Sequence, residues 1–148
     1  MLSKPYHGWT DFQLNGTSAY QLSYLDDIAF TWLDQAIQGL QAMHPFCVKG
    51  FLEPNRLLCL VSYRSCHILI EDDENGVLST TESSPTTMLD FCKALHRDIS
   101  TFAEDWAIFS GRKVNPAAKE SLLLEKLTKL QHLITAREFL SGDDCCFL

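Results

Sequence analysis

The sequence predicts an α+β domain in which one antiparallel sheet, a meander of about four to five strands, packs against two to three helices. Three features predict this fold. Strand-like runs follow one another in the middle of the chain, an Asn-Gly turn joins two of them, and amphipathic helices flank them. The length of 148 residues, with 46% hydrophobic and 21% charged residues, is typical of a globular chain. Because no repeat or linker divides it, we expect residues 1–148 to form a single domain.

The N-terminal part predicts a strand followed by a helix. Residues 9–14 alternate apolar and polar side chains, as in a half-buried strand, and a turn follows at Asn15-Gly16. Residues 18–25 fit either a short strand or irregular chain. Asp26-Asp27 then suits the N-cap of a helix, and His44-Pro45 ends it. Between these signals, apolar residues recur at helical spacing, at Ala29, Trp32, Leu33, Ala36, Ile37, Leu40 and Met43.

The middle of the chain predicts an antiparallel meander. Residues 46–52, 56–64 and 66–71 are strand-like runs, and Glu53-Pro54-Asn55 suits a tight reversal between the first two. The third run is followed by the polar segment Glu71–Gly76, whose Asn-Gly pair favours a hairpin turn. Residues 77–82 then form the expected return strand.

Two helices are expected after the meander. The first has a single apolar stripe and ends at Ser110-Gly111. The second begins after Asn115-Pro116, because proline suits the first turn of a helix. Residues 141–148 are expected to form a flexible tail. The stripe of the first helix consists of Met88, Phe91, Cys92, Leu95, Ile99, Phe102, Trp106 and Phe109, and that of the second of Leu123, Leu127, Leu130 and Ile134.

The charge is negative and unevenly distributed. The net charge is -7, and residues 67–110 carry nine acidic against two basic side chains. Such a field repels phosphate backbones, which argues against a nucleic-acid partner, and attracts a basic protein.

No apolar run in the sequence approaches the length of a membrane span, and the first residues lack the apolar run of a secretory signal. We therefore expect a cytoplasmic protein that does not bind membranes.

The acidic hairpin resembles one local metal-binding motif. Read from Glu71, acids or amides stand at positions one, three and five, glycine at six and Glu82 at twelve, as in an EF-hand calcium loop. An EF-hand needs an incoming helix, whereas residues 59–70 read as strands, and Pro85 interrupts the exit. A solvated turn fits this context better than a calcium site.

The six cysteines show no metal or redox spacing. Cys47, Cys59, Cys66 and Cys92 lie in apolar segments and are expected to be reduced core residues. The sequence Cys145-Cys146-Phe147-Leu148 has the form of a prenylation box, but Asp143-Asp144 precede it where basic residues usually assist membrane attachment. An unmodified tail is the expected state.

No catalytic constellation is recognisable. The five histidines are scattered and lack paired ligand spacing, and neither a nucleophile elbow nor a glycine-rich phosphate loop occurs. We therefore assign no catalytic residue, no metal ligand and no cofactor. Acid pairs assembled only in three dimensions leave an enzyme of unrecognised type as an open alternative.

One family resemblance covers residues 22–109. The segment begins with Leu22-Ser23-Tyr24-Leu25-Asp26 and a helix carrying Trp32 and Leu33. A strand ending near Glu53-Pro54, two further strands, the acidic hairpin and a long amphipathic helix follow. This order is similar to that of small immunity proteins from bacterial contact-dependent growth inhibition and related polymorphic toxin systems.

The resemblance implies a protein that occludes a cognate toxin domain in the producing cell. Many such toxins are nucleases with basic surfaces, which an acidic inhibitor complements. Trp9, Tyr20 and Tyr24 would serve as aromatic anchors if they are exposed. An adaptor or secretion chaperone for a partner protein is the alternative from another functional class. The partner-binding residues expected on this basis are Glu71, Asp72, Asp73, Glu74 and Glu82 on the hairpin, and Asp90, Asp98, Glu104 and Asp105 on the helix.

Overall fold

The computed structural model describes residues 1–110 and 115–144, apart from the side chains of residues 80, 81 and 141–144. It confirms the α+β fold class. Six strands and four helices occur within these residues. In chain order they are β1 (Trp9–Phe12), β2 (Tyr20–Ser23), α1 (Ile28–Ala42), β3 (Phe46–Phe51), β4 (Arg56–Val61), β5 (Cys66–Glu71), β6 (Leu78–Ser84), α2 (Met88–Thr101), α3 (Ala103–Ala107) and α4 (Pro116–Asp144).

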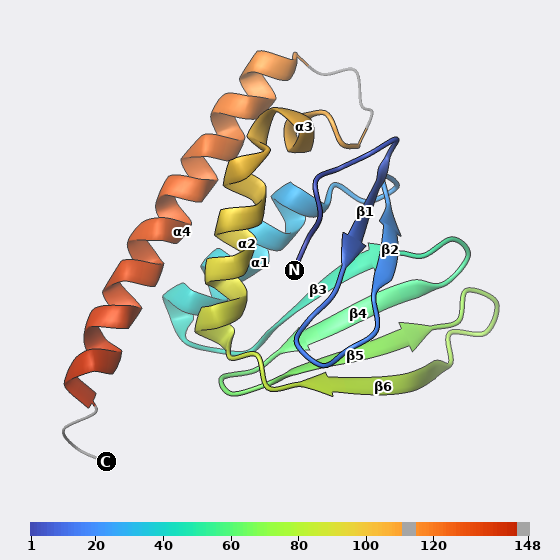
Figure 1. Cartoon of the computed structure of the whole chain (residues 1–148), viewed down its shortest axis with the longest axis horizontal. Coiled ribbons are helices and arrows are strands. Elements are labelled where there is room, and N and C mark those ends of the chain that lie inside the picture. The colour runs from blue at the N-terminus through green and yellow to red at the C-terminus, as the bar shows by residue number, and fades with distance from the viewer. Residues whose placement is uncertain (111–114, 145–148) are drawn as a thin grey trace.

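The main sheet is the predicted antiparallel meander. Its four strands lie in the order β3-β4-β5-β6, and β1 and β2 form a separate two-stranded antiparallel sheet. Figure 1 shows the helices and the β1–β2 hairpin on one side of the main sheet, with α4 outermost. The hairpin packs close to β3 because Gly50 has no side chain; a Cβ there would lie 2.8 Å from a methyl carbon of Leu22.

The core lies between the sheet and the helices and is built on the predicted apolar stripes. Trp32 of α1 is fully buried and contacts Phe12 of β1 edge-to-face, with ring centroids 5.2 Å apart, and Phe91 of α2, at 6.1 Å. Cys59, Cys66 and Cys92 are free, buried thiols of this core, in line with their expected role.

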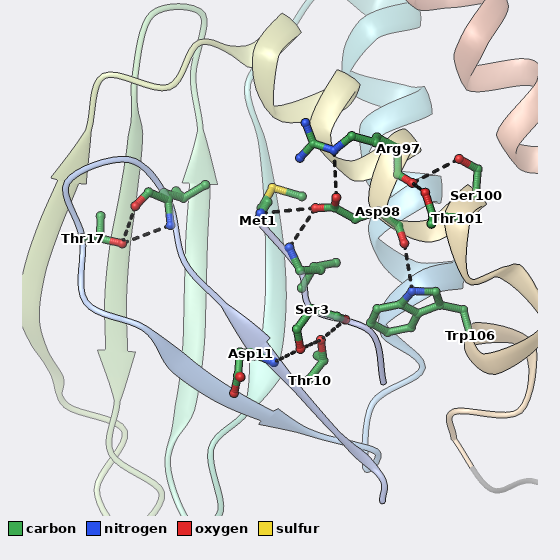
Figure 2. Close-up of polar contacts among 12 residues, drawn as sticks. Met1, Ser3, Thr10, Asp11, Thr17, Arg97, Asp98, Ser100, Thr101 and Trp106 are labelled. Atoms are coloured by element: carbon green, nitrogen blue, oxygen red, sulfur yellow. Dashed lines mark hydrogen bonds and ion pairs between the residues drawn. The ribbon is translucent and has the colours of Figure 1, made fainter. Parts of the chain in front are cut away.

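The expected helix over residues 88–109 is two helices, and this prediction was wrong. In a continuous helix the amide of Phe102 would donate to the Asp98 carbonyl, but that carbonyl accepts the indole N–H of Trp106 at 3.3 Å. The Phe102 amide donates to Ile99 instead, and the Thr101 hydroxyl donates to the Arg97 carbonyl at 2.6 Å. Together these contacts end α2 and begin α3; Figure 2 shows those of Trp106 with Asp98 and of Thr101 with Arg97.

Helix α4 runs along α1, α2 and α3 and is fixed by both packing and charge. Its buried face is the predicted stripe, formed by Leu123, Leu127, Leu130 and Ile134. Its amino-terminal half makes an ion pair with α1, because Lys119 lies 3.0 Å from Asp27. Asp27 occupies the N-cap position of α1, yet its carboxylate makes no cap hydrogen bond; it binds this lysine instead. The predicted tail from residue 141 begins inside α4, which continues to Asp144; residues 145–148 lie outside the described chain.

The interface between α2 and α4 makes stability depend on pH. Burial lowers the pKa of His96, and a hydrogen bond with the backbone of Leu127 opposes this effect in part. The unfolded chain therefore takes up a proton near pH 6.5, at a higher pH than the folded protein does. The contribution of His96 to stability is complete above pH 6.5 and falls as the pH drops toward the folded-state pKa.

We expect the midpoint of urea unfolding to fall between pH 7.5 and pH 5.5 more steeply in the parent than in His96→Gln, because glutamine removes this proton uptake. The comparison of the two pH series isolates His96 from the other histidines. If the urea midpoints of the parent and of His96→Gln fell equally with pH, His96 would be solvated equally in the folded and unfolded states, which would contradict this prediction.

Candidate functional site: an acidic turn end

Two turns of the meander lie at the same end of the sheet. Alternate connections of an antiparallel meander meet at one end, so the β3–β4 turn lies beside the β5–β6 turn (Figure 1). The Asp73 amide donates to the Asn55 side chain at 3.5 Å. Arg56, at the start of β4, lies 3.1 Å from Glu71 and 3.2 Å from Asp73. These contacts tie the two turns into one surface.

We call this surface the acidic turn end. It comprises residues 52–56 and 71–78, which carry five carboxylates and one guanidinium. Val77 and Leu78 are 56% and 52% exposed there and give it an apolar centre. The carboxylates are those of Glu53, Glu71, Asp72, Asp73 and Glu74.

The geometry of the turn differs from that of a calcium loop. The Asp72 carboxylate accepts the amide of Glu74 at 2.8 Å and that of Asn75 at 3.4 Å, so it closes its own turn. Glu71 and Asp73 face Arg56. The loop connects two strands, and Gly76 adopts a positive φ of 67° that completes the reversal. No cluster of potential metal ligands occurs among the described residues.

Glu82 lies away from the acidic turn end and is held by the β1–β2 hairpin. Its carboxylate accepts the hydroxyl of Tyr20, the amide of Ser18 at 3.1 Å and the hydroxyl of Ser18 at 3.0 Å. The bonds from Tyr20 and Ser18 lower the pKa of Glu82. Desolvation and the same carboxylate raise the pKa of Tyr20 to about 12. Glu82 therefore links β6 to the hairpin.

The remaining predicted acids lie on the helices and do not join the acidic turn end. Asp90 is exposed in the first turn of α2, near Lys93 and Arg97, and Glu104 and Asp105 begin α3. Helix α2 follows the opposite end of β6, where Ser84 pairs with Cys66. The six residues of β5 separate the two ends by about 17 Å. Figure 1 shows the β5–β6 turn far from α2 and α3.

Asp98 anchors the N-terminus. Its carboxylate lies 3.3 Å from the Met1 ammonium and accepts the Leu2 amide at 2.9 Å, and its other oxygen accepts from Arg97 at 3.0 Å (Figure 2). The side chain is only 13% exposed. Asp98 thus has a structural role that a count of acidic residues could not distinguish from a docking role.

The substitution Asp98→Ala is expected to lower the free energy of unfolding by about 1–3 kcal/mol, because it leaves the Met1 ammonium and the amide of buried Leu2 without their acceptor. Urea denaturation followed by circular dichroism measures this. The matched control is Asp90→Ala on the same helix, for which less than about 1 kcal/mol is expected. Equal losses in the two variants would contradict the anchoring role.

The three proposed aromatic anchors differ in exposure. Tyr24 is 46% exposed, whereas Trp9 and Tyr20 are half-buried. Only Tyr24 of these three offers a large free surface, and it lies beside Gly8, just beyond the end of the β1–β2 sheet, rather than at the acidic turn end.

Two further findings concern membrane-spanning helices and similarity to known proteins. Over the residues that the structure describes, no helix combines the length and the hydropathy needed to cross a membrane. Neither protein-family models, nor curated proteins, nor solved structures gave a match to this chain. The fold and the surface described above are therefore the basis for a functional assignment.

Proposed function

We propose that this chain is an immunity-type binding protein of the bacterial cytoplasm, which neutralises a cognate toxin domain by direct occlusion. The acidic turn end is the observation that carries the proposal. It gathers five carboxylates and only one guanidinium within two adjoining turns. Such a local excess of negative charge suits a basic surface, for example the phosphate-binding face of a nuclease.

The composition of the acidic turn end supports a protein partner over a small ion. Val77 and Leu78 are exposed among the carboxylates, and apolar side chains contribute most when a partner excludes water from them. The charged rim would accelerate encounter, and the apolar centre would slow dissociation. No cofactor enters this function.

The test is protection of cells from a toxin domain encoded beside this chain. Cells that express the toxin domain are expected to grow when the parent chain is co-expressed, and the two proteins are expected to co-purify. A chain that co-purifies with no toxin domain and leaves growth arrested would contradict the proposal.

An adaptor or secretion chaperone is the second candidate, and an exposed apolar cluster favours it. The side chains of Met43, Tyr63 and Leu140 are 41%, 49% and 49% exposed. Met43, Tyr63 and Leu140 line a cavity of about 250 Å³ between the end of α1, the β4–β5 turn and α4. Contiguous apolar surface of this kind is used by proteins that hold a partner segment. A stable complex with a secreted substrate, rather than with a toxin domain, would select this candidate.

A further inference from the structure

The main sheet has a covered face and an open face. Side chains alternate between the two faces along each strand. Leu57, Cys59 and Val61 of β4 are buried in the core. Leu58 and Leu60 alternate with them in the sequence and therefore point to the opposite side. The helices and the β1–β2 hairpin lie on the covered side (Figure 1), so none of the described helices shields Leu58 or Leu60.

The open face is apolar where a solvated sheet face is usually polar. The ladder places Leu58 of β4 beside Leu69 of β5, and Leu60 beside His67. Leu60 is 40% exposed, and Leu78, at one end of this face, is 52% exposed. Contiguous apolar surface outside the core is typical of a contact with another protein molecule. We call this surface the outer sheet face; its apolar residues are Cys47, Phe51, Leu58, Leu60, Leu69 and Leu78.

The two ends of the outer sheet face carry opposite charges. The acidic turn end adjoins it at one end, and the β4–β5 turn, residues 62–65, adjoins it at the other, about 17 Å away along β5. Arg64 in that turn is exposed and belongs to none of the ion pairs among the described residues. His67 lies beside the same turn, with its Nε2 atom 3.2 Å from the Ser65 hydroxyl. A second molecule in reversed orientation therefore meets unlike charge at both ends.

We propose that two copies of this chain associate through their outer sheet faces, about a two-fold axis that crosses the strands at Leu58 and Leu69. Such an interface uses the same surface on both copies, so each of these leucines meets its counterpart at the axis. The axis reverses the strands, and the β4–β5 turn of each copy covers the acidic turn end of the other. Arg64 then faces the tip of that surface, where Glu74 is exposed and, within the described chain, pairs with no cation. Sheets stacked in this way lie about 10 Å apart.

The area of the outer sheet face suits a reversible dimer. Four strands spaced about 4.8 Å apart and about 20 Å long cover roughly 400 Å² per copy. That is about half of the 800 Å² or so that each partner buries in a stable, specific interface, and the turns at both ends add to it. We therefore expect association that depends on protein concentration.

The net charge of -7 on each copy does not prevent this association. At about 0.15 M salt the Debye length is about 8 Å, so the unlike charges in contact outweigh like charges that lie farther apart. The association does not rest on the proposed function. It covers part of the acidic turn end, so a basic partner would compete with the second copy.

The experiment is analytical ultracentrifugation of the intact chain at micromolar to millimolar concentration, with a reducing agent that excludes disulfide-linked dimers. The mass is expected to rise from 16.8 kDa toward twice that value as the concentration increases. Leu69→Lys places two ammonium groups together at the axis and should weaken the dimer by about tenfold or more. Leu124→Lys, the matched control on the exposed side of α4, should dimerise as the parent does.

A charge exchange tests the orientation of the two copies. Arg64→Glu and Glu74→Arg should each weaken the dimer by about tenfold, because each places like charges together across the interface. The variant with both substitutions should dimerise as the parent does. Residues 64 and 74 lie at opposite ends of β5 in one chain, so this rescue requires contact between copies.

Two results would overturn the proposal. One is a parent chain that stays monomeric at every concentration; if its Leu69→Lys variant then lost binding to a toxin domain, the outer sheet face would belong to that partner instead. The other is a dimer that neither Leu69→Lys nor Arg64→Glu weakens, which would place the contact elsewhere. If Leu69→Lys does not fold, the charge exchange decides, because Arg64 and Glu74 are both exposed.

Discussion

Replacing Trp32 with alanine is expected to lower the free energy of unfolding by about 3–5 kcal/mol, the range for a fully buried aromatic side chain. The side chain is 0% exposed and packs between Phe12 and Phe91, so it joins β1, α1 and α2. Its indole N–H also binds the Lys49 carbonyl. Urea denaturation measures the loss.

Two controls separate the contributions of Trp32. Trp32→Phe retains an aromatic ring but loses the N–H donor, so a smaller loss than for alanine is expected. Leu124→Ala removes a leucine of α4 that is 48% exposed and should change stability by less than about 0.5 kcal/mol. A loss below about 1 kcal/mol in Trp32→Ala would contradict the central place of this residue in the core.

Neutralising the β5–β6 turn is expected to slow association with the cognate toxin domain by tenfold or more, within the roughly 10–10³ range of electrostatic steering. The variant carries Glu71→Gln, Asp72→Asn, Asp73→Asn and Glu74→Gln. The amides preserve side-chain shape, and the amide that replaces the Asp72 carboxylate retains an oxygen that can accept the turn N–H groups. Stability should change little, since the pairs of Arg56 with Glu71 and Asp73 are partly exposed. Stopped-flow mixing measures the rate.

A variant with the same change in net charge elsewhere provides the control. Asp90→Asn, Glu104→Gln, Glu120→Gln and Glu125→Gln also remove four negative charges, from α2, α3 and α4. Association should slow much less in this variant, because steering depends on charge near the docking surface. Equal slowing in the two variants would show that overall charge, not the acidic turn end, governs encounter.

The fold was largely predictable because its signals are local. Alternation predicted β1, helical spacing predicted α1 and α4, and Asn75-Gly76 predicted the β5–β6 turn. The break at Phe102 was not predictable from spacing, because it depends on the Trp106 indole taking the Asp98 carbonyl. The apolar stripe continues through the break, so the pattern alone indicates one helix.

The candidate site was only partly predictable. Glu71–Glu74 were identified from a charge run, but Glu53 was missed although the expected meander brings its turn to the same end of the sheet. Charge alone could not show that Asp98 binds the N-terminus or that Glu82 binds Tyr20, since both contacts join segments far apart in the sequence. Position in the fold, rather than the sign of the charge, separates docking carboxylates from structural ones.

The most direct measurement of the proposed function is the association rate with the cognate toxin domain from low to high ionic strength. If the acidic turn end steers a basic partner, the rate of the parent falls steeply as salt rises, while that of the variant neutralised at residues 71–74 changes little. A parent rate that does not depend on salt would contradict the account.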